Sequence, residues 1–389
     1  MAPPRAVQLN EANAFLKEHP EVQYVDLLIT DMNGVVRGKR IERASLHKVY
    51  EKGINLPASL FALDINGITV ESTGLGMDIG DSDRICFPIP NTLSKEPWQK
   101  RPTAQLLMTM HERDGAPFFA DPREVLRQVV SKFDELGLTI CAAFELEFYL
   151  IDQENINGRP QPPRSPISGK RPHSTQVYLI DDLDEYVDCL QDILEGAKEQ
   201  GIPADAIVKE SAPAQFEVNL HHVADPIKAC DYAVLLKRLI KNIAYDHEMD
   251  TTFMAKPYPG QAGNGLHVHI SLLDKKTGKN IFAAEDPLEN TSLRHAVGGI
   301  LEPDHQHALD TLAQAEAAPA GRVDRGQRQA EDGVGLGRSR PVRRLRRGGD
   351  LGLVRHRVQR HGEGLALAPA QHVELHGRPG LAVRNHSGQ

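Results

Sequence analysis

The segment CAAFELEFYLI at residues 141–151 constrains the fold more than any other, because it places two glutamates inside a strand-like apolar run. Successive side chains of a strand point to opposite faces. Glu145 and Glu147 therefore share one face, while the aromatic and leucine residues around them share the other and face a core. Two adjacent buried carboxylates are costly unless a cation compensates them. The pattern indicates a metal site, and a polar, solvent-facing strand edge is the alternative interpretation.

Composition and charge exclude several classes of protein. The 389 residues suffice for two domains, or for one large domain with an accessory module. A net charge of −8 offers no basic surface for nucleic acid or membrane, and no run approaches the roughly 18 apolar residues of a membrane span. The N-terminus lacks a signal-peptide pattern, and the four cysteines are too widely spaced for a disulfide framework or a cysteine metal site: Cys86, Cys141, Cys189 and Cys230. We expect a cytoplasmic protein with no membrane partner and no nucleic-acid partner.

The composition changes after Leu301. Residues 302–389 contain no Lys, Phe, Tyr, Trp, Ile, Met or Cys, yet they hold 14 Arg and only 10 acidic residues. A segment without aromatic residues, Ile or Met cannot easily bury a core. We expect this Arg-, Gly- and Ala-rich tail to be disordered and to lie outside the folded part of the protein.

Three interpretations of this tail compete. The run RSRPVRRLRRGGD suits an arginine-rich nucleic-acid arm, but no aromatic residues are interleaved for base stacking. A flexible linker or interaction tail would have a similar composition. Thirdly, the missing residue types have AT-rich codons and the abundant ones have GC-rich codons, which is what a GC-rich gene yields when it is read out of frame. We favour a frameshift near residue 300.

Turn and capping signals define the first elements. Residues 22–41, VQYVDLLITDMNGVVRGKRI, are typical of a hairpin with a type I′ turn at Asn33-Gly34. Residues 121–137 are typical of a helix that begins at an aspartate N-cap and ends at a glycine, with Glu124 closing a capping box.

The remainder of the first 301 residues alternates strands with helices. Hydrophobic periodicity predicts a helix at 182–201, a strand at 215–220, a helix at 225–248, and strands at 251–257 and 265–272. A proline-rich loop at 158–172 joins the carboxylate strand to the next element. Antiparallel-looking strands interrupted by helices indicate an α+β fold behind a small β-rich N-terminal domain.

Possible metal ligands recur at same-face spacing on separate strands. They are Glu145 and Glu147, Glu210 and Glu217, and His267 and His269. A lone His-x-His pair is more often structural than a ligand, but the whole set is harder to explain in that way. A carboxylate-dominated set suits Mg²⁺ or Mn²⁺ rather than zinc. Enough carboxylates for two ions favour phosphoryl transfer, with a two-metal hydrolase as the alternative, and the sequence has no P-loop.

Three motifs together, FELEFYL, KESAPAQFEVN and GNGLHVHISL, resemble the glutamine synthetase family. The resemblance runs from about Val22 to Leu301, and within the family the chain looks most like the glutamate–putrescine ligases. The resemblance implies an N-terminal β-grasp domain at 1–112, a catalytic domain beginning at 113 and continuing to 301, and assembly into a dodecamer with active sites between subunits. It also implies ATP-dependent ligation of an amine, either putrescine, another polyamine or ammonia, to the γ-carboxylate of glutamate through γ-glutamyl phosphate.

The resemblance also implies a role for individual residues. One ion would be held by Glu147, Glu210 and Glu217, and the ion that bridges the ATP phosphates by Glu145 and His267. His269 and Ser271 would contact ATP, and Gly263, Asn264 and Gly265 would form the loop around glutamate. Glu210 would take a proton from the incoming amine, and Asp64 of a neighbouring subunit would help to bind and deprotonate it.

The tail departs from the family pattern. The family continues with an Asn-Ser-Tyr-Arg-Arg segment, an Asn-Arg pair and a final metal glutamate, and residues 302–389 contain none of these motifs. The chain also ends short of the usual family length. Arginines that stabilise a transferring phosphoryl group are worth orders of magnitude in rate. We therefore expect this chain to have little or no activity, and a regulatory or assembly subunit is the alternative.

Overall fold

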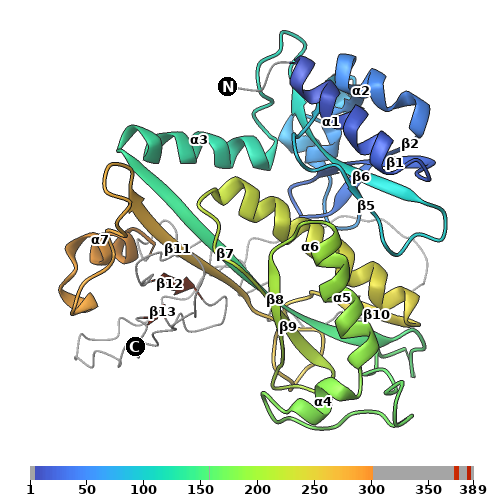
Figure 1. The fold of residues 1–389 in the computed structure, drawn as a ribbon, viewed down its shortest axis with the longest axis vertical. Coiled ribbons are helices and arrows are strands. Elements are labelled where there is room, and N and C mark those ends of the chain that lie inside the picture. The colour runs from blue at the N-terminus through green and yellow to red at the C-terminus, as the bar shows by residue number, and fades with distance from the viewer. Residues whose placement is uncertain (1–4, 157, 301–371, 376–382, 387–389) are drawn as a thin grey trace, which may run out of the picture.

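The fold contains two β-sheets, each covered by helices (Figure 1). A computed structural model describes residues 5–156, 158–300, 372–375 and 383–386. In these residues the mixture of strands and helices is the α+β fold that the sequence predicted. No helix among them is long and apolar enough to cross a bilayer.

The N-terminal sheet has the strand order β2-β1-β6-β4-β3, with β5 paired to β6. Its first helices, α1 and α2, contact each other on the same side of the molecule (Figure 1). The bounds are α1 Arg5–Glu18, β1 Tyr24–Thr30, β2 Val36–Glu42, α2 Leu46–Lys52, β3 Ile54–Pro57, β4 Asp83–Pro88, β5 Ser94–Lys95 and β6 Thr103–His111. The strands β1 and β6 run parallel, and the other pairs in this sheet are antiparallel.

The hairpin of β1 and β2 is confirmed, but its predicted type I′ turn is wrong. A type I′ turn needs positive φ at both central residues, and only Gly34 has it, with φ 68°. The connection is instead organised by Asp31, whose Oδ1 accepts the backbone N–H groups of Asn33 and Val35 at 2.8 and 2.9 Å. The Asp31 side chain thus holds this turn in place, and Asn33 does not adopt the positive φ of a type I′ turn.

The second sheet is built around β7, which is flanked by β11 on one edge and by β9 on the other. Its strand order is β13-β12-β11-β7-β9-β8, with β10 paired to the end of β7. The strands span β7 Leu138–Asp152, β8 Ala204–Lys209, β9 Gln215–Leu220, β10 Met249–Thr252, β11 Leu266–Asp274, β12 His372–Leu375 and β13 Val383–His386. All of the pairings in this sheet are antiparallel.

Two helices, α5 (Val187–Glu199) and α6 (Pro226–Asp246), cover one face of this sheet. Leu146, Phe148 and Leu150 of β7 point into the core below them and are at most 4% exposed. Because side chains alternate along a strand, the residues between these three point to the opposite face. The predicted division of β7 into an apolar face and a carboxylate face is thus what the packing shows.

Helix α3 (Pro122–Glu135) begins at the predicted Asp121 N-cap, which accepts the Arg123 N–H at 3.0 Å. The predicted capping box does not form. Glu124 pairs instead with Arg127, one turn along the helix. Asp121 also accepts the N–H of Met110 in β6, so this cap joins α3 to the N-terminal sheet.

Two other predicted elements need correction. The predicted helix at 182–201 is divided into α4 (Ile180–Asp184) and α5, with Tyr186 as the N-cap of α5. The predicted strand at 251–257 is wrong beyond Thr252, where β10 ends. Of the tail at 302–389, only β12 and β13 belong to the described residues, and the expected disorder is wrong for these two strands because β12 pairs with β11 and β13 pairs with β12. The expectation about the remainder lies outside the described residues. Within the described residues, the last helix is α7 (Thr291–Ile300).

A buried ion-pair network joins the two sheets through Arg238 of α6. Its guanidinium donates to Glu96 at 2.6 Å, to Asp26 at 3.1 Å and to Gln105 at 3.1 Å, all in the N-terminal sheet region. It also lies 5.5 Å from the ring of Trp98. Burial raises the pKa of Glu96, and Arg238 opposes that rise. The buried carboxylate of Glu96 therefore depends on Arg238.

We expect Arg238→Met to destabilise the protein by about 3–5 kcal/mol, because it leaves the buried carboxylate of Glu96 without its cation. Arg40→Met is the matched control. Arg40 also pairs with Asp26, but its side chain is 49% exposed and its loss should cost about 1 kcal/mol or less. Urea unfolding of both variants measures the difference, and equal losses would contradict this account of the network.

Candidate metal and substrate site

The register of three adjacent strands brings the predicted ligands together. His267 of β11 lies opposite Glu145 of β7, and Glu147 of β7 lies opposite Glu217 of β9. These side chains project from the face that α5 and α6 leave uncovered. The same-face spacing in the sequence thus becomes a cluster, because neighbouring strands are only about 5 Å apart.

The ligand atoms form two groups that share one residue. One group contains Glu147, Glu210 and Glu217, and the other contains Glu145, Glu217 and His267; within each group the ligand atoms lie within 4.8 Å of one another. Glu210 reaches the cluster from the turn that follows β8. The sequence assigned Glu217 to the first group only, whereas its position lets it serve both. Oxygen-rich groups of this kind fit hard divalent cations.

Glu147 is a buried carboxylate with two like charges beside it. Its side chain is only 3% exposed, and burial raises the pKa of its carboxyl to about 7, with Glu210 and Glu217 adding to the rise. The Gly265 N–H donates to its Oε2 at 2.8 Å and opposes the rise. Like charges therefore crowd this position.

Glu145 is neutralised differently, by imidazole. Burial opposes its ionisation, yet the hydrogen bonds from His267 and His269 outweigh burial and lower the pKa of Glu145 to about 2. Its oxygens lie 2.9 Å from His267 Nδ1 and 3.1 Å from His269 Nε2. Burial disfavours the His267 cation, but Glu145 and Glu217 raise its pKa to about 10. An ion bound here would have to displace the proton from His267.

A loop at 262–265 closes over the carboxylates. Asn264 anchors it by donating to the carbonyls of Thr252 and Met254 at 3.2 and 3.0 Å. A Cβ at Gly265 would lie 2.9 Å from Glu147 Oε1, and a Cβ at Gly263 would lie 2.5 Å from the Ala255 carbonyl oxygen. The Ala255 backbone leaves no room for a side chain at Gly263, and a side chain at Gly265 would displace the Glu147 carboxylate. The expectation that this loop surrounds glutamate stays a prediction.

The remaining predicted residues of β11 lie on the same face. His269 is 7% exposed and Ser271 is 1% exposed, so both are buried on β11 beside strand β7. The ring of His222, which follows β9, packs edge-on against His269 with the centroids 5.7 Å apart. Sequence reasoning did not single out His222, since it lies outside the strand pattern.

Asp64 lies in the N-terminal sheet region and outside both ligand groups. Its Oδ1 accepts the N–H groups of Asn66 and Ile68, each at 2.8 Å, so within one chain it shapes the turn at 64–68. The expectation placed Asp64 in the site of a neighbouring subunit, and a single chain leaves that role a prediction.

Gln215 is a second site residue that the sequence left without a role. Its polar face was predicted, but an amide in the pattern Gln215, Glu217, Asn219 gave no metal-ligand signal. In the structure Gln215 is fully buried and its Nε2 lies 3.2 Å from Glu147 Oε2.

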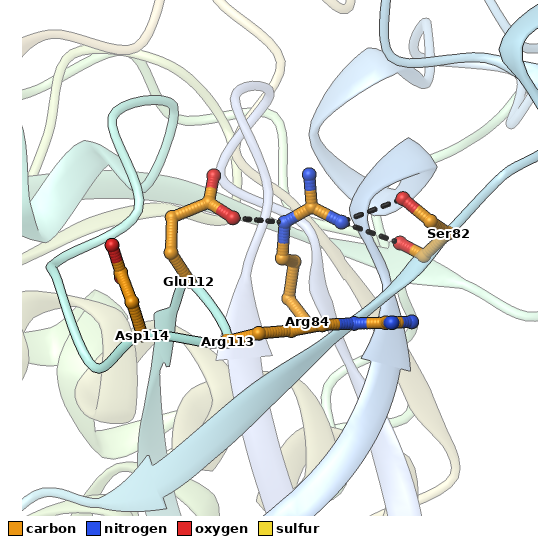
Figure 2. Close-up of a pocket in the computed structure, with 5 residues that line it drawn as sticks. All are labelled: Ser82, Arg84, Glu112, Arg113 and Asp114. Atoms are coloured by element: carbon orange, nitrogen blue, oxygen red, sulfur yellow. Dashed lines mark hydrogen bonds and ion pairs between the residues drawn. The ribbon is translucent and has the colours of Figure 1, made fainter.

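A pocket on the N-terminal sheet does not resemble a substrate site (Figure 2). It is lined by Ser82, Arg84, Glu112, Arg113 and Asp114, none of which belongs to the cluster. The Arg84 guanidinium in this pocket already has partners, because its Nε lies 2.5 Å from Glu112 Oε2 and its Nη1 donates to Ser82 Oγ at 2.6 Å. The carboxylate cluster is therefore the better candidate for chemistry.

The catalytic domain of glutamine synthetase is the family that matches residues 119–322, more than half of the chain. The match extends past Leu301, so the family likeness continues further than the compositional change suggested. The chain is 43% identical over 293 residues to γ-glutamylputrescine synthetase PuuA of Escherichia coli K12, which covers 75% of this chain and 62% of that protein.

Other relatives include proteins with different names. Glutamate–isopropylamine ligase of a Pseudomonas species is 31% identical over 71% of this chain and 59% of its own length, and glutamine synthetase of Pyrococcus abyssi is 31% identical over 75% and 59%. The chain thus spans about three fifths of the curated relatives that it matches. Among solved structures, a GmaS/ADP complex has a TM-score of 0.63 at 24% identity and covers 78% of this chain and 64% of that one. This last likeness concerns the fold alone.

The shared position of Glu217 gives a test by substitution. We expect Glu217→Gln to abolish most of the thermal stabilisation by Mn²⁺, because it removes a ligand from both groups. The matched variant Glu145→Gln removes a ligand from one group only and should retain part of the stabilisation. A thermal-shift titration with Mn²⁺ measures both. If Glu217→Gln responded to Mn²⁺ like the unmodified protein, the shared-ligand geometry would be wrong.

Proposed function

Because the chain belongs to the glutamine synthetase family, we propose that it derives from a ligase that uses ATP to join an amine to the γ-carboxylate of glutamate. The proposed acceptor is putrescine or another polyamine, with ammonia as the simplest alternative. The observation that carries the proposal is the pair of ligand groups that share Glu217. The acceptor is supported by the relative named γ-glutamylputrescine synthetase.

The ligand groups suit the first half of such a reaction. Mg²⁺ or Mn²⁺ would neutralise charge on the phosphate oxygens while the γ-phosphoryl group of ATP moves to glutamate. Glu147, Glu210 and Glu217 would hold the ion nearer to glutamate, and Glu145 with His267 the other. The pKa of about 7 for Glu147 fits this task, since a bound cation would relieve the crowding of its neighbours.

The residues around the ions have proposed tasks of their own. His269 and Ser271, buried on the same face of β11, would contact ATP. The backbone of Gly263, Asn264 and Gly265 would surround glutamate. A carboxylate oxygen of Glu210 lies within 4.8 Å of the ligand oxygens of Glu147 and Glu217. Glu210 would take a proton from the incoming ammonium group.

Assembly extends the proposal beyond one chain. We propose a dodecamer in which Asp64 of one subunit completes the amine site of the next, with an N-terminal domain at 1–112 and a catalytic domain that begins at residue 113. The proposed location is the cytoplasm, and the four free cysteines fit a reducing compartment.

We propose that this chain itself has little or no ligase activity. The support is the composition of residues 302–389, which lacks the arginine segments expected of the family. We expect the purified chain to release no more ADP than a blank when it is given Mg-ATP, glutamate and putrescine. ADP release that required glutamate and an amine together would contradict this part of the proposal.

The coding DNA separates a lesion from a real tail. If the tail is a frameshift, another reading frame across residues 290–389 encodes the Asn-Ser-Tyr-Arg-Arg segment and the final metal glutamate. The chain restored to that frame should then release ADP only with glutamate and an amine, and faster with putrescine than with ammonia. Glu210→Gln in the restored chain should lower this rate by about 100-fold or more.

The second candidate is a regulatory or assembly subunit, which the altered tail favours. In that case no reading frame restores the missing segments, and the printed chain enters rings of an intact relative. Size-exclusion chromatography of the two proteins expressed together measures this. Aggregation or rapid proteolysis of the printed chain would count against the second candidate.

A further inference from the structure

Gln215 occupies the first position of β9 and lies opposite Tyr149 of β7. The two side chains reach the same loop. Tyr149 donates its hydroxyl to the Ala262 carbonyl at 2.6 Å, and Gln215 Nε2 donates to the Gly263 carbonyl at 2.9 Å. Both residues are at most 1% exposed. A fully buried amide in this position must satisfy its donors and its acceptor inside the protein.

The surroundings of Gln215 fix which way its amide points. Nε2 faces three acceptors: Glu147 Oε2 at 3.2 Å, the Gly263 carbonyl oxygen and Asn264 Oδ1 at 3.1 Å. Oε1 faces a donor, the Ala212 N–H, at 3.2 Å. The reversed amide would turn an acceptor toward three acceptors and a donor toward a donor. One orientation therefore satisfies the site.

The Gln215 amide is one reason that the two carboxylate oxygens of Glu147 have different partners. Oε2 accepts from Gln215 and from the Gly265 N–H. Oε1 lies toward the cluster, 3.9 Å from His267 Nε2. With Oε2 committed to neutral donors, Oε1 is the oxygen that can ligate an ion.

We propose that Gln215 is a positioning residue, which fixes the Glu147 carboxylate so that Oε1 is presented to the ion of the Glu147, Glu210 and Glu217 group. The inference rests on the proposed function, because it takes that group as an ion site. Gln215 touches neither the ion nor the substrate in this role. It acts through Glu147 and through the loop at 262–265.

The same amide also couples Glu147 to the turn that carries Glu210. The Ala212 N–H that donates to Gln215 belongs to this turn, and Lys209 Nζ binds the carbonyls of Glu210 and Ala212 at 2.5 and 2.8 Å. Two of the three ligands in the group are thus aligned by contacts that meet at Gln215. Losing the amide should loosen both of them together.

A neutral amide suits this position better than the alternatives. A lysine or arginine would neutralise Glu147 and compete with the cation, whereas an apolar side chain would leave Oε2 without one of its two donors. Partners that orient metal ligands typically contribute about 10–100-fold to metal affinity. We expect a loss in that range when the Gln215 amide is removed.

The test is a Mn²⁺ titration followed by electron paramagnetic resonance, with Gln215→Met as the variant. Methionine keeps the length of the side chain and removes its donors. Gln105→Met is the matched control, because Gln105 is also fully buried and hydrogen-bonded but lies in the N-terminal sheet. A parallel titration in a Glu145→Gln background reports the Glu147 group alone.

The inference predicts a 10–100-fold weaker Mn²⁺ affinity for Gln215→Met and a change of less than about twofold for Gln105→Met, whatever each variant does to stability. Unchanged Mn²⁺ affinity in a folded Gln215→Met protein would overturn it. If that variant does not fold, Gln215→Asn, whose amide stops one methylene short, gives the same two outcomes. Failure of the unmodified protein to bind Mn²⁺ would instead overturn the proposed function.

Discussion

The crowding of carboxylates on the face of one sheet opposite α5 and α6 is the constraint on which the site depends. Glu147 and Glu217 face each other across β7 and β9, and Glu210 approaches them from the turn after β8. Antiparallel pairing keeps the Glu147 and Glu217 carboxylates close together, because cross-strand neighbours stay about 5 Å apart. The fold tolerates this arrangement because a large apolar core lies directly behind it, in the layer formed by α5 and α6.

The carboxylates at the two ends of the cluster are held in different ways. At Glu145 the protein supplies its own positive charge from His267, whereas at Glu147 it supplies neutral donors from Gly265 and Gln215. Neutral donors hold a carboxylate in place without cancelling its charge. Under the proposed function, the Glu147 end would hold its ion between carboxylates alone, and an ion at the Glu145 end would displace the proton of His267. This asymmetry matches a site in which two ions have different neighbours and different tasks.

Strand periodicity predicted the same-face pairs of the cluster, and the family resemblance grouped them with Glu210, whereas local signals failed where a tertiary contact decided the outcome. Two same-face pairs could be recognised in the sequence, because side chains two residues apart on a strand always point to the same face. These pairs are Glu145 with Glu147 and His267 with His269. The turn at Gly34 and the pairing of Glu124 could not be recognised in this way, since Asp31 and Arg127 offered competing partners. Gln215 was overlooked for a related reason. Its role depends on which loop lies above β9, and no local pattern specifies that loop.

The most direct test of the account is the Mn²⁺ stoichiometry of the unmodified chain, measured by electron paramagnetic resonance at increasing metal concentration. Two ligand groups that share Glu217 would hold two ions close together. The account predicts two bound Mn²⁺ per chain, with a spectrum broadened by spin coupling between them. A single bound Mn²⁺ with an uncoupled spectrum, or no specific binding, would contradict it.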